Sequence, residues 1–520
     1  MKERLIQNFT NTKTEWLKEK DVFFSSLIIG LLSHSYMMFN KLPNIDDYVS
    51  MFHYGLGYQL GRWLLALIGN FMFRIDGVYS LPFLNGIFFL FMLSVSITIF
   101  LKPFPFKNRL TKRIFAALFI SFPTVASTLG FMFTVPFYGI AILFAAIAFY
   151  FVPRYKYGFI LSGFFICCSL GIYQAYWCLC ASFLLLYLIV LCLDEKYSTK
   201  ELLLISLKSF FSLLSGVILY LIINRLMLSV QGINLSDYQG VSQMGTIKLS
   251  AIPDIFLNAY GTFFKLISEN YLYITWYPIV RFVIAASYGL TLLFLIIAIY
   301  ILRKNPLKII FLIGFSAIVP LTINSIYIMC NDASTIHLLM CYSVVLVFLL
   351  PLVFIQGVIS NSSKSSVFKG IKAVYLMAVL LVIFFYVRLA NIYYLNLEMA
   401  YNETNAFMTT LSARIQDTDG YTLDTPIYFH GLYSQSPNKN IWELRMVNQM
   451  HGTIDVHNVI NSPLIRGNFF RVYLGNSFKE LPDYSIMDQH TAYMNQMPNY
   501  PDDGSIEIID DVLVVKFAEK

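Results

Sequence analysis

Long apolar stretches separated by short polar loops extend from residue 22 to residue 393. A helix needs about 20 mostly apolar residues to cross a bilayer. The fifth and sixth stretches form one apolar run, which Gly171-Ile172-Tyr173-Gln174 divides. The pattern predicts eleven membrane-spanning helices at 22–39, 80–101, 114–132, 136–152, 158–172, 175–193, 203–226, 282–301, 309–329, 338–358 and 373–393.

The basic residues of the short loops predict the orientation of these helices, because cytoplasmic loops are rich in Lys and Arg. With a cytoplasmic N-terminus and alternating spans, every basic short loop falls on the cytoplasmic side. With one span fewer, the later basic loops would fall on the outer side. The placement of all basic loops on one side therefore supports the division of the apolar run at Tyr173. The residues concerned are Lys2, Arg4, Lys13, Lys18, Lys20, Lys102, Lys107, Arg109, Lys112, Arg113, Arg154, Lys156, Lys196, Lys200, Arg303, Lys304, Lys308, Lys364, Lys369 and Lys372.

Three longer segments then lie outside the cell: the loops 40–79 and 228–281 and the C-terminal segment 394–520. Stretches 425–429 and 512–517 alternate like β-strands. The pattern predicts an all-α polytopic membrane protein with a cytoplasmic tail (1–21), a transmembrane domain (22–393) and a small extracytoplasmic α+β domain (394–520). Near-helical apolar spacing over 48–63 and 252–267 predicts two further helices in the membrane interface.

Composition agrees with a membrane protein. Only 13% of the 520 residues are charged and 57% are hydrophobic, with a mean hydropathy of +0.64, whereas soluble proteins have about 25% charged residues. The net charge of +7 belongs to the loops, so no nucleic-acid partner is expected. The seven cysteines lie in or beside apolar stretches and show no disulfide or metal-binding spacing.

Two adjacent acids, Asp46 and Asp47, follow the first predicted span. A carboxylate close to the bilayer carries a desolvation cost, so acids in such positions commonly have a function. One of them, with Asp47 favoured, is a candidate general base for an acceptor hydroxyl, while the other orients it or shares a cation. If a divalent cation such as Mg²⁺ or Mn²⁺ takes part, Asp46 and Asp47 would hold it. The alternative is a turn with helix-capping side chains.

Arg62 is a candidate ligand for a phosphate, because its guanidinium makes bidentate hydrogen bonds to oxyanions. It follows Gly61, which permits close backbone approach, and precedes Trp63. The alternative is an anchor to lipid headgroups. Tyr173 and Gln174, at a predicted external tip, are candidates for binding a sugar hydroxyl; the alternative is a polar turn.

A short external loop before the tenth predicted span carries Asn331, Asp332 and His337. These side chains are candidates for lining the donor site, and capping of the next helix is the equally weighted alternative. Walker-type phosphate loops, HExxH and G-x-S-x-G motifs are all missing from the sequence.

Three motifs resemble the bacterial type II glucosyl transferase family: Asn44-Ile45-Asp46-Asp47, Gly61-Arg62-Trp63 and Ser169-Leu170-Gly171-Ile172-Tyr173-Gln174-Ala175. The resemblance covers roughly the first 200 residues with recognisable motifs. It implies a GT-C-like membrane glycosyltransferase that uses a polyprenyl-phosphate sugar. It also implies an acidic catalytic residue in the first external loop, at Asp46 or Asp47.

The function expected from the resemblance is transfer of a hexose, namely glucose, from undecaprenyl phosphate to a surface polysaccharide or teichoic-acid-like acceptor. The reaction would take place at the outer face of the bacterial cytoplasmic membrane. A flippase or transporter for lipid-linked glycans would instead predict charged residues inside the spans and matched halves. A polymerase or ligase would predict external arginines and histidines, and a membrane scaffold would need no site.

Overall fold

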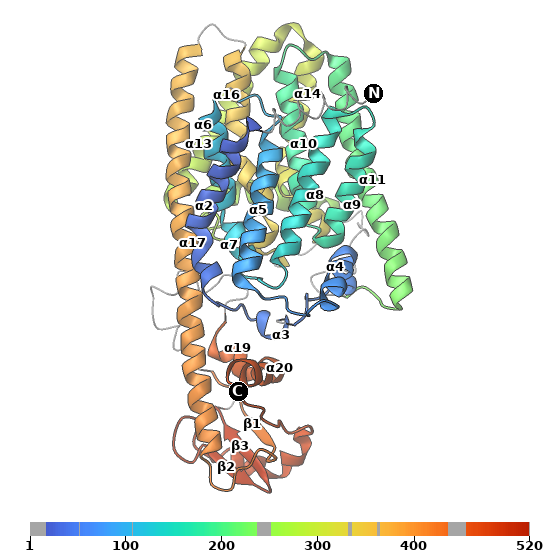
Figure 1. Ribbon diagram of the computed structural model, residues 1–520. Helices are drawn as coiled ribbons and strands as arrows, with labels where there is room; N and C mark the ends of the chain where they lie inside the picture. The colour runs from blue at the N-terminus through green and yellow to red at the C-terminus, as the bar shows by residue number, and fades with distance from the viewer. Residues whose placement is uncertain are drawn as a thin grey trace. The chain divides into compact units, whose positions relative to one another are not determined.

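The computed structural model describes residues 17–50, 52–106, 108–236, 251–330, 335–360, 365–434 and 454–518 (Figure 1). The chain divides into two compact units. The first comprises Met1–Asn40 and Tyr54–Asn391, and the second comprises Lys41–His53 and Ile392–Lys520. The loop that carries the two aspartates therefore groups with the C-terminal part of the chain.

The first unit is a bundle of helices. Its elements are α2 (Lys20–Phe39), η1 (Tyr58–Leu60), α4 (Trp63–Phe73), α5 (Pro82–Leu101), α6 (Arg109–Ser121), α7 (Pro123–Leu129), α8 (Val135–Arg154), α9 (Gly158–Ile172), α10 (Tyr176–Leu193), α11 (Thr199–Gln231), α12 (Ile252–Ser268), α13 (Pro278–Ile301), η4 (Leu302–Lys304), α14 (Pro306–Ile323), α15 (Ile326–Met329), η6 (Leu338–Met340), η7 (Tyr342–Phe348) and α16 (Leu350–Ser360). The helix α17 (Ser365–Gln416) begins in this unit and ends in the second.

Within the described residues, nine helices are long and apolar enough to cross a membrane, or ten if the bent pair α6–α7 counts as one span. All eleven predicted ranges coincide with helical segments. Because α9 has only 15 residues, the total of eleven spans stays a prediction. The predicted break at Tyr173 is confirmed, since α9 ends at Ile172 and α10 begins at Tyr176.

Burial separates central from peripheral helices. In the most apolar stretch of α10, 94% of the residues are buried, whereas in the corresponding stretches of α11 and α14 only 22% are buried. Helix α8 packs against α5, α9 and α10, and α9 packs against α11 (Figure 1). Exposed leucine and phenylalanine side chains run along α2 and α11. Soluble proteins rarely expose such long apolar faces, so these helix faces are suited to contact lipid.

The helix predicted over 48–63 is wrong. A four-residue helix α3 (Asp47–Ser50) is followed by turns and then by η1. Gly55 and Gly61 have φ values of 83° and 70°, a left-handed backbone that cannot continue an α-helix. The helix predicted at 252–267 is confirmed as α12.

The second unit contains a three-stranded sheet in the order β1-β3-β2, with β1 parallel and β2 antiparallel to β3. Both predicted strands are confirmed, as β1 and β3. The hairpin turn between β2 and β3 is Asp510-Asp511, with φ of 47° and 62°, as two-residue hairpins require. The elements are β1 (Ile427–His430), α19 (Val456–Asn461), α20 (Pro463–Asn468), the π-helix η9 (Phe469–Tyr473), η10 (Tyr484–His490), α21 (Thr491–Met494), β2 (Ile506–Ile509) and β3 (Val512–Lys516).

Candidate active site

The backbone fixes Arg62 at a sharp corner of the first unit. Helix η1 ends at Leu60 and is capped by Gly61, whose left-handed conformation turns the chain. The Arg62 N–H then donates to the Gly57 carbonyl at 3.0 Å, and α4 begins at Trp63. Arg62 thus lies between a hydrogen-bonded turn and the first residue of α4. Because its backbone is fixed on both sides, its side chain can point in only a few directions.

Two motifs that lie about a hundred residues apart meet at this corner. The Gln174 Nε2 donates to the Leu60 carbonyl at 2.7 Å, and the Tyr220 hydroxyl donates to the Gly61 carbonyl at 3.1 Å. A Cβ on Gly171 would lie 2.6 Å from the indole of Trp63. The absence of a side chain at Gly171 therefore allows Trp63 to approach α9, and Gln174 helps to hold the turn that ends at Arg62.

The Arg62 guanidinium lies among tyrosines. Its Nη1 donates to the Tyr138 hydroxyl at 3.4 Å, and its Cζ is 5.1 Å from the centre of the Tyr173 ring. The Tyr138 and Tyr173 rings are 4.5 Å apart. Within the described chain, no carboxylate forms an ion pair with Arg62 and its buried Nε has no hydrogen-bond partner. A guanidinium in this setting is well suited to bind an anion.

The Tyr173 hydroxyl is buried and has no hydrogen-bond partner among the described residues. Burial raises the pKa of Tyr173 well above its usual value, Tyr138 adds to the effect and Arg62 opposes it. The hydroxyl therefore stays neutral and can donate a hydrogen bond. Arg62, Tyr173 and Gln174, three of the predicted substrate-binding residues, lie together in the first unit.

The two aspartates differ in exposure. Asp47 is 2% exposed, and its Oδ2 accepts from the Asn44 N–H at 2.8 Å. Asp46 is exposed, and its N–H donates to the Asn44 Oδ1 at 3.0 Å. The turn and capping geometry considered in the sequence analysis is therefore present. It engages one carboxylate oxygen of Asp47 and the backbone N–H of Asp46.

The residue after the aspartates anchors their loop to the rest of the second unit. The Tyr48 ring packs at 5.2 Å from Phe469 and 4.8 Å from Tyr473, two residues of the π-helix η9. Burial raises the pKa of Tyr48 well above its usual value, and Tyr473, Tyr401 and Asp47 add to the effect. A neutral, buried Tyr48 therefore fixes the position of Asp47.

The third candidate loop is only partly described. Asn331 and Asp332 lie outside the described residues. His337 precedes η6, and its carbonyl accepts from the Met340 N–H at 2.9 Å. Among the described residues, no group of three or more His, Cys, Asp or Glu side chains is placed to hold a metal ion.

Tyr138 and Tyr220 are site residues that the sequence did not reveal. Tyr138 lies in α8 and Tyr220 in α11, where tyrosines in apolar stretches look like ordinary membrane-facing residues. Only the packing of α8 and α11 around α9 brings them to Arg62 and Gly61. No local pattern distinguishes them.

The sequence profile of the glucosyl transferase GtrII family matches residues 35–348, more than half of the chain. The match includes Asp46, Asp47, Arg62 and Gln174 and ends before the segment 392–520 of the second unit. Comparison with curated proteins and with solved structures gives no significant match.

Proposed function

The chain belongs to the glucosyl transferase GtrII family, and from this premise we propose that it transfers glucose from a polyprenyl-phosphate carrier such as undecaprenyl phosphate. The acceptor is a polysaccharide of the bacterial cell surface, and the reaction takes place at the outer face of the cytoplasmic membrane. A multispan helical body of this kind suits a lipid-linked donor, because the carrier's chain can stay in the bilayer during transfer.

The environment of Arg62 is the observation that carries this proposal. A partly buried guanidinium with tyrosines around it and no acidic partner in the described chain is a site for an anion. The anion we assign to it is the phosphate of the donor, which gains negative charge as its bond to the sugar breaks. Stabilising such charge is commonly the largest contribution to catalysis.

We assign the role of general base to Asp46, because Asp46 is exposed whereas Asp47 is buried. Asp47 is the positioning residue, since its carboxylate holds the turn through the Asn44 N–H. This assignment exchanges the roles favoured from the sequence. A divalent cation bound by these aspartates is not required by the proposed steps.

The reaction is a single displacement. The acceptor hydroxyl oxygen attacks the anomeric carbon, and its proton passes to the carboxylate of Asp46. The bond between the anomeric carbon and the phosphate oxygen breaks, and the carrier phosphate leaves with the electron pair. Attack from the side opposite the phosphate inverts the anomeric centre.

The test uses the purified full-length protein in liposomes that contain radiolabelled polyprenyl-phosphate glucose and a surface-polysaccharide extract. We expect label to move into the polysaccharide and free polyprenyl phosphate to accumulate. Labelled UDP-glucose serves as the control donor and should give no transfer without the lipid carrier. Equal transfer from UDP-glucose would contradict the proposal.

A further inference from the structure

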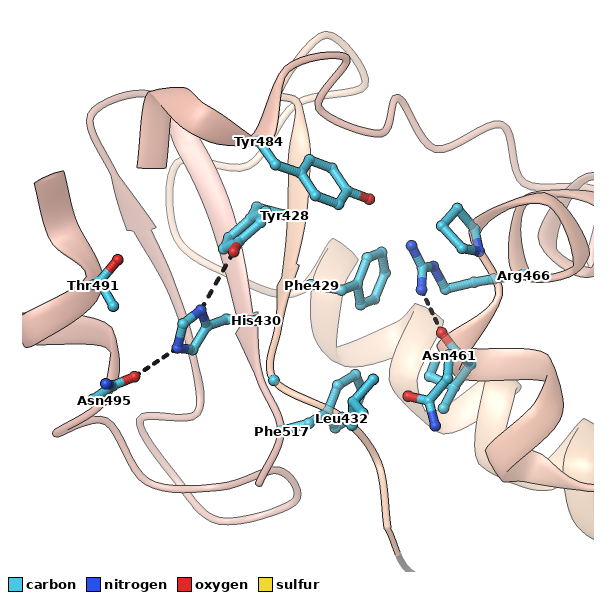
Figure 2. Close-up of a pocket in the computed structure, with 13 residues that line it drawn as sticks. Tyr428, Phe429, His430, Leu432, Asn461, Arg466, Tyr484, Thr491, Asn495 and Phe517 are labelled. Atoms are coloured by element: carbon cyan, nitrogen blue, oxygen red, sulfur yellow. Dashed lines mark hydrogen bonds between the residues drawn. The ribbon is translucent and has the colours of Figure 1, made fainter. Parts of the chain in front are cut away.

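A cavity of about 480 Å³ lies in the C-terminal part of the second unit, at the edge of β1 that faces away from β3. Figure 2 shows aromatic and polar side chains around it, from β1, α19, α20 and α21. Cavities of this size bind small organic ligands. The lining residues are Tyr428, Phe429, His430, Gly431, Leu432, Ile460, Asn461, Pro463, Arg466, Tyr484, Thr491, Asn495 and Phe517.

The only cation with a fixed charge among these lining residues is neutralised. Arg466 is 3% exposed, and its Nε and Nη2 each donate to a carboxylate oxygen of Glu480 at 3.0 Å. Its Nη1 donates to the Ile460 carbonyl, and its guanidinium lies 3.8 Å from the centre of the Phe429 ring. Because this charge is paired, the cavity favours a neutral ligand over a phosphate.

A second set of polar groups surrounds His430. Its Nε2 lies 2.7 Å from the Asn495 Oδ1, and its Nδ1 lies 3.4 Å from the Tyr428 hydroxyl (Figure 2). Because the Asn495 oxygen accepts from Nε2, the imidazole donates there and accepts at Nδ1. Asn495 and Thr491 line the cavity. The Asn495 amide N–H groups are donors, whereas the Thr491 hydroxyl donates to the Asp488 carbonyl at 2.8 Å and offers its oxygen as an acceptor.

Aromatic surface accompanies these polar groups. The Tyr428 and Tyr484 rings meet edge to face at 5.0 Å, and Tyr484 is 38% exposed. The C–H groups on one face of a pyranose pack on such rings, which carry negative charge on their faces. The hydroxyls on the rim of the sugar need donors and acceptors of the kind that Asn495 and Thr491 offer.

The backbone at the strand edge adds a further pair of groups. Ile427 directs its N–H and carbonyl away from β3, where they bond to Lys479 and Leu481. Alternate residues of a strand direct their backbone groups to the same side, so those of Phe429 face this same edge. The His430 carbonyl, in contrast, accepts from the Phe517 N–H of the chain beyond β3.

We propose that this cavity, which we call the β1-edge pocket, binds a neutral, hexose-containing saccharide. Its role as a docking site for the acceptor polysaccharide rests on the proposed glucosyl transfer; the binding itself does not. The family match ends at residue 348, so the pocket lies in a part of the chain that the shared family sequence does not cover. That location suits recognition of an acceptor specific to this protein.

The test measures binding of the full-length protein, in nanodiscs without donor lipid, to an array of neutral hexose and N-acetylhexosamine oligosaccharides. Anionic glycans, poly(glycerol phosphate) and unstructured peptides form the comparison arms. We expect binding to neutral oligosaccharides, and we expect Tyr484→Ala and Asn495→Ala each to weaken it about tenfold, equivalent to about 1.4 kcal/mol.

Tyr493→Ala is the matched control, because Tyr493 is also an exposed tyrosine of this unit, at 52% exposure, but does not line the pocket. It should leave binding unchanged. Binding only to anionic polymers or peptides, no binding to neutral glycans, or binding that neither pocket variant weakens would each overturn the proposal. Because donor lipid is left out, a failure of glucosyl transfer would not affect this result.

Discussion

At the scale of single residues, the functional assignment depends on what surrounds each charge. Arg62 is surrounded by tyrosine rings and hydroxyls, whereas Arg466 has a carboxylate on two of its nitrogens. A guanidinium paired with a carboxylate has little charge left for another anion. The same residue type therefore serves as a candidate phosphate ligand in one unit and as a structural group in the other.

Arg62→Lys should lower kcat/KM for the lipid-linked donor by about 100-fold, because lysine lacks the planar pair of donors that binds two phosphate oxygens. Steady-state kinetics with varied donor concentration measures the effect. Arg225→Lys is the control, since Arg225 is an exposed residue of α11. Normal kinetics in the Arg62→Lys variant would leave Arg62 as an anchor to headgroups.

Asp46→Asn should reduce the transfer rate by about 100- to 10,000-fold, as expected for loss of a general base. Asp47→Asn should retain far more activity, because an asparagine oxygen can still accept from the Asn44 N–H. Single-turnover rates of the two variants, at equal amounts of folded protein, decide between them. The reverse order would make Asp47 the base, and normal rates in both would exclude this loop from catalysis.

At the scale of elements, the close approach of α4 to α9 brings together two of the three family motifs, those that contain Trp63 and Gly171. Gly171→Ala would place a Cβ 2.6 Å from the Trp63 indole, and overpacking of this kind costs about 1–3 kcal/mol. We expect a lower melting temperature in detergent together with a loss of transfer activity, since the displaced Trp63 adjoins Arg62.

Gly289→Ala is the matched control for Gly171→Ala. Gly289 lies in α13, and an added Cβ would have no heavy atom within 4 Å. Alanine is the better helix former by about 1 kcal/mol, so this variant should be at least as stable as the parent protein. If both variants unfolded at the parent temperature, the contact between Trp63 and α9 would not be tight.

At the scale of the whole molecule, the chain passes from one unit to the other more than once. Residues 41–53 belong with the C-terminal segment, and α17 connects the bundle to that segment as a single 52-residue helix. The aspartate loop is consequently stabilised by residues more than four hundred positions away, such as Phe469. Changes in the C-terminal unit should therefore affect Asp46 and Asp47.

The predicted topology can be tested by single cysteines at Glu195 and Ser477, both exposed. With the second unit outside the cell and the basic loops inside, an impermeant thiol reagent should label only Ser477→Cys in intact cells. Both variants should react after the membrane is permeabilised. The seven native cysteines are free, and six of them are buried, so the parent protein provides the background. Labelling of Glu195→Cys in intact cells would reverse the predicted orientation.

The sequence by itself predicted the eleven apolar helical segments and the strands β1 and β3. It also singled out Arg62, Tyr173 and Gln174, which the structure brings together. These features follow from local patterns: apolar length sets a helix, alternation sets a strand, and short motifs mark Arg62, Tyr173 and Gln174. The tertiary structure alone decided that no continuous helix runs from residue 48 to residue 63, because Gly55 and Gly61 adopt left-handed backbone.

The tertiary structure also decided which groups meet. Tyr138 contacts Arg62, and Tyr220 contacts Gly61, only because distant segments pack together. The same is true of the contacts of Tyr48 with η9 and of His430 with Asn495. The angle and depth at which two elements pack depend on many side chains at once, and no local pattern encodes them. The sequence therefore singled out individual polar residues, whereas the groups that contact them were decided by the tertiary structure.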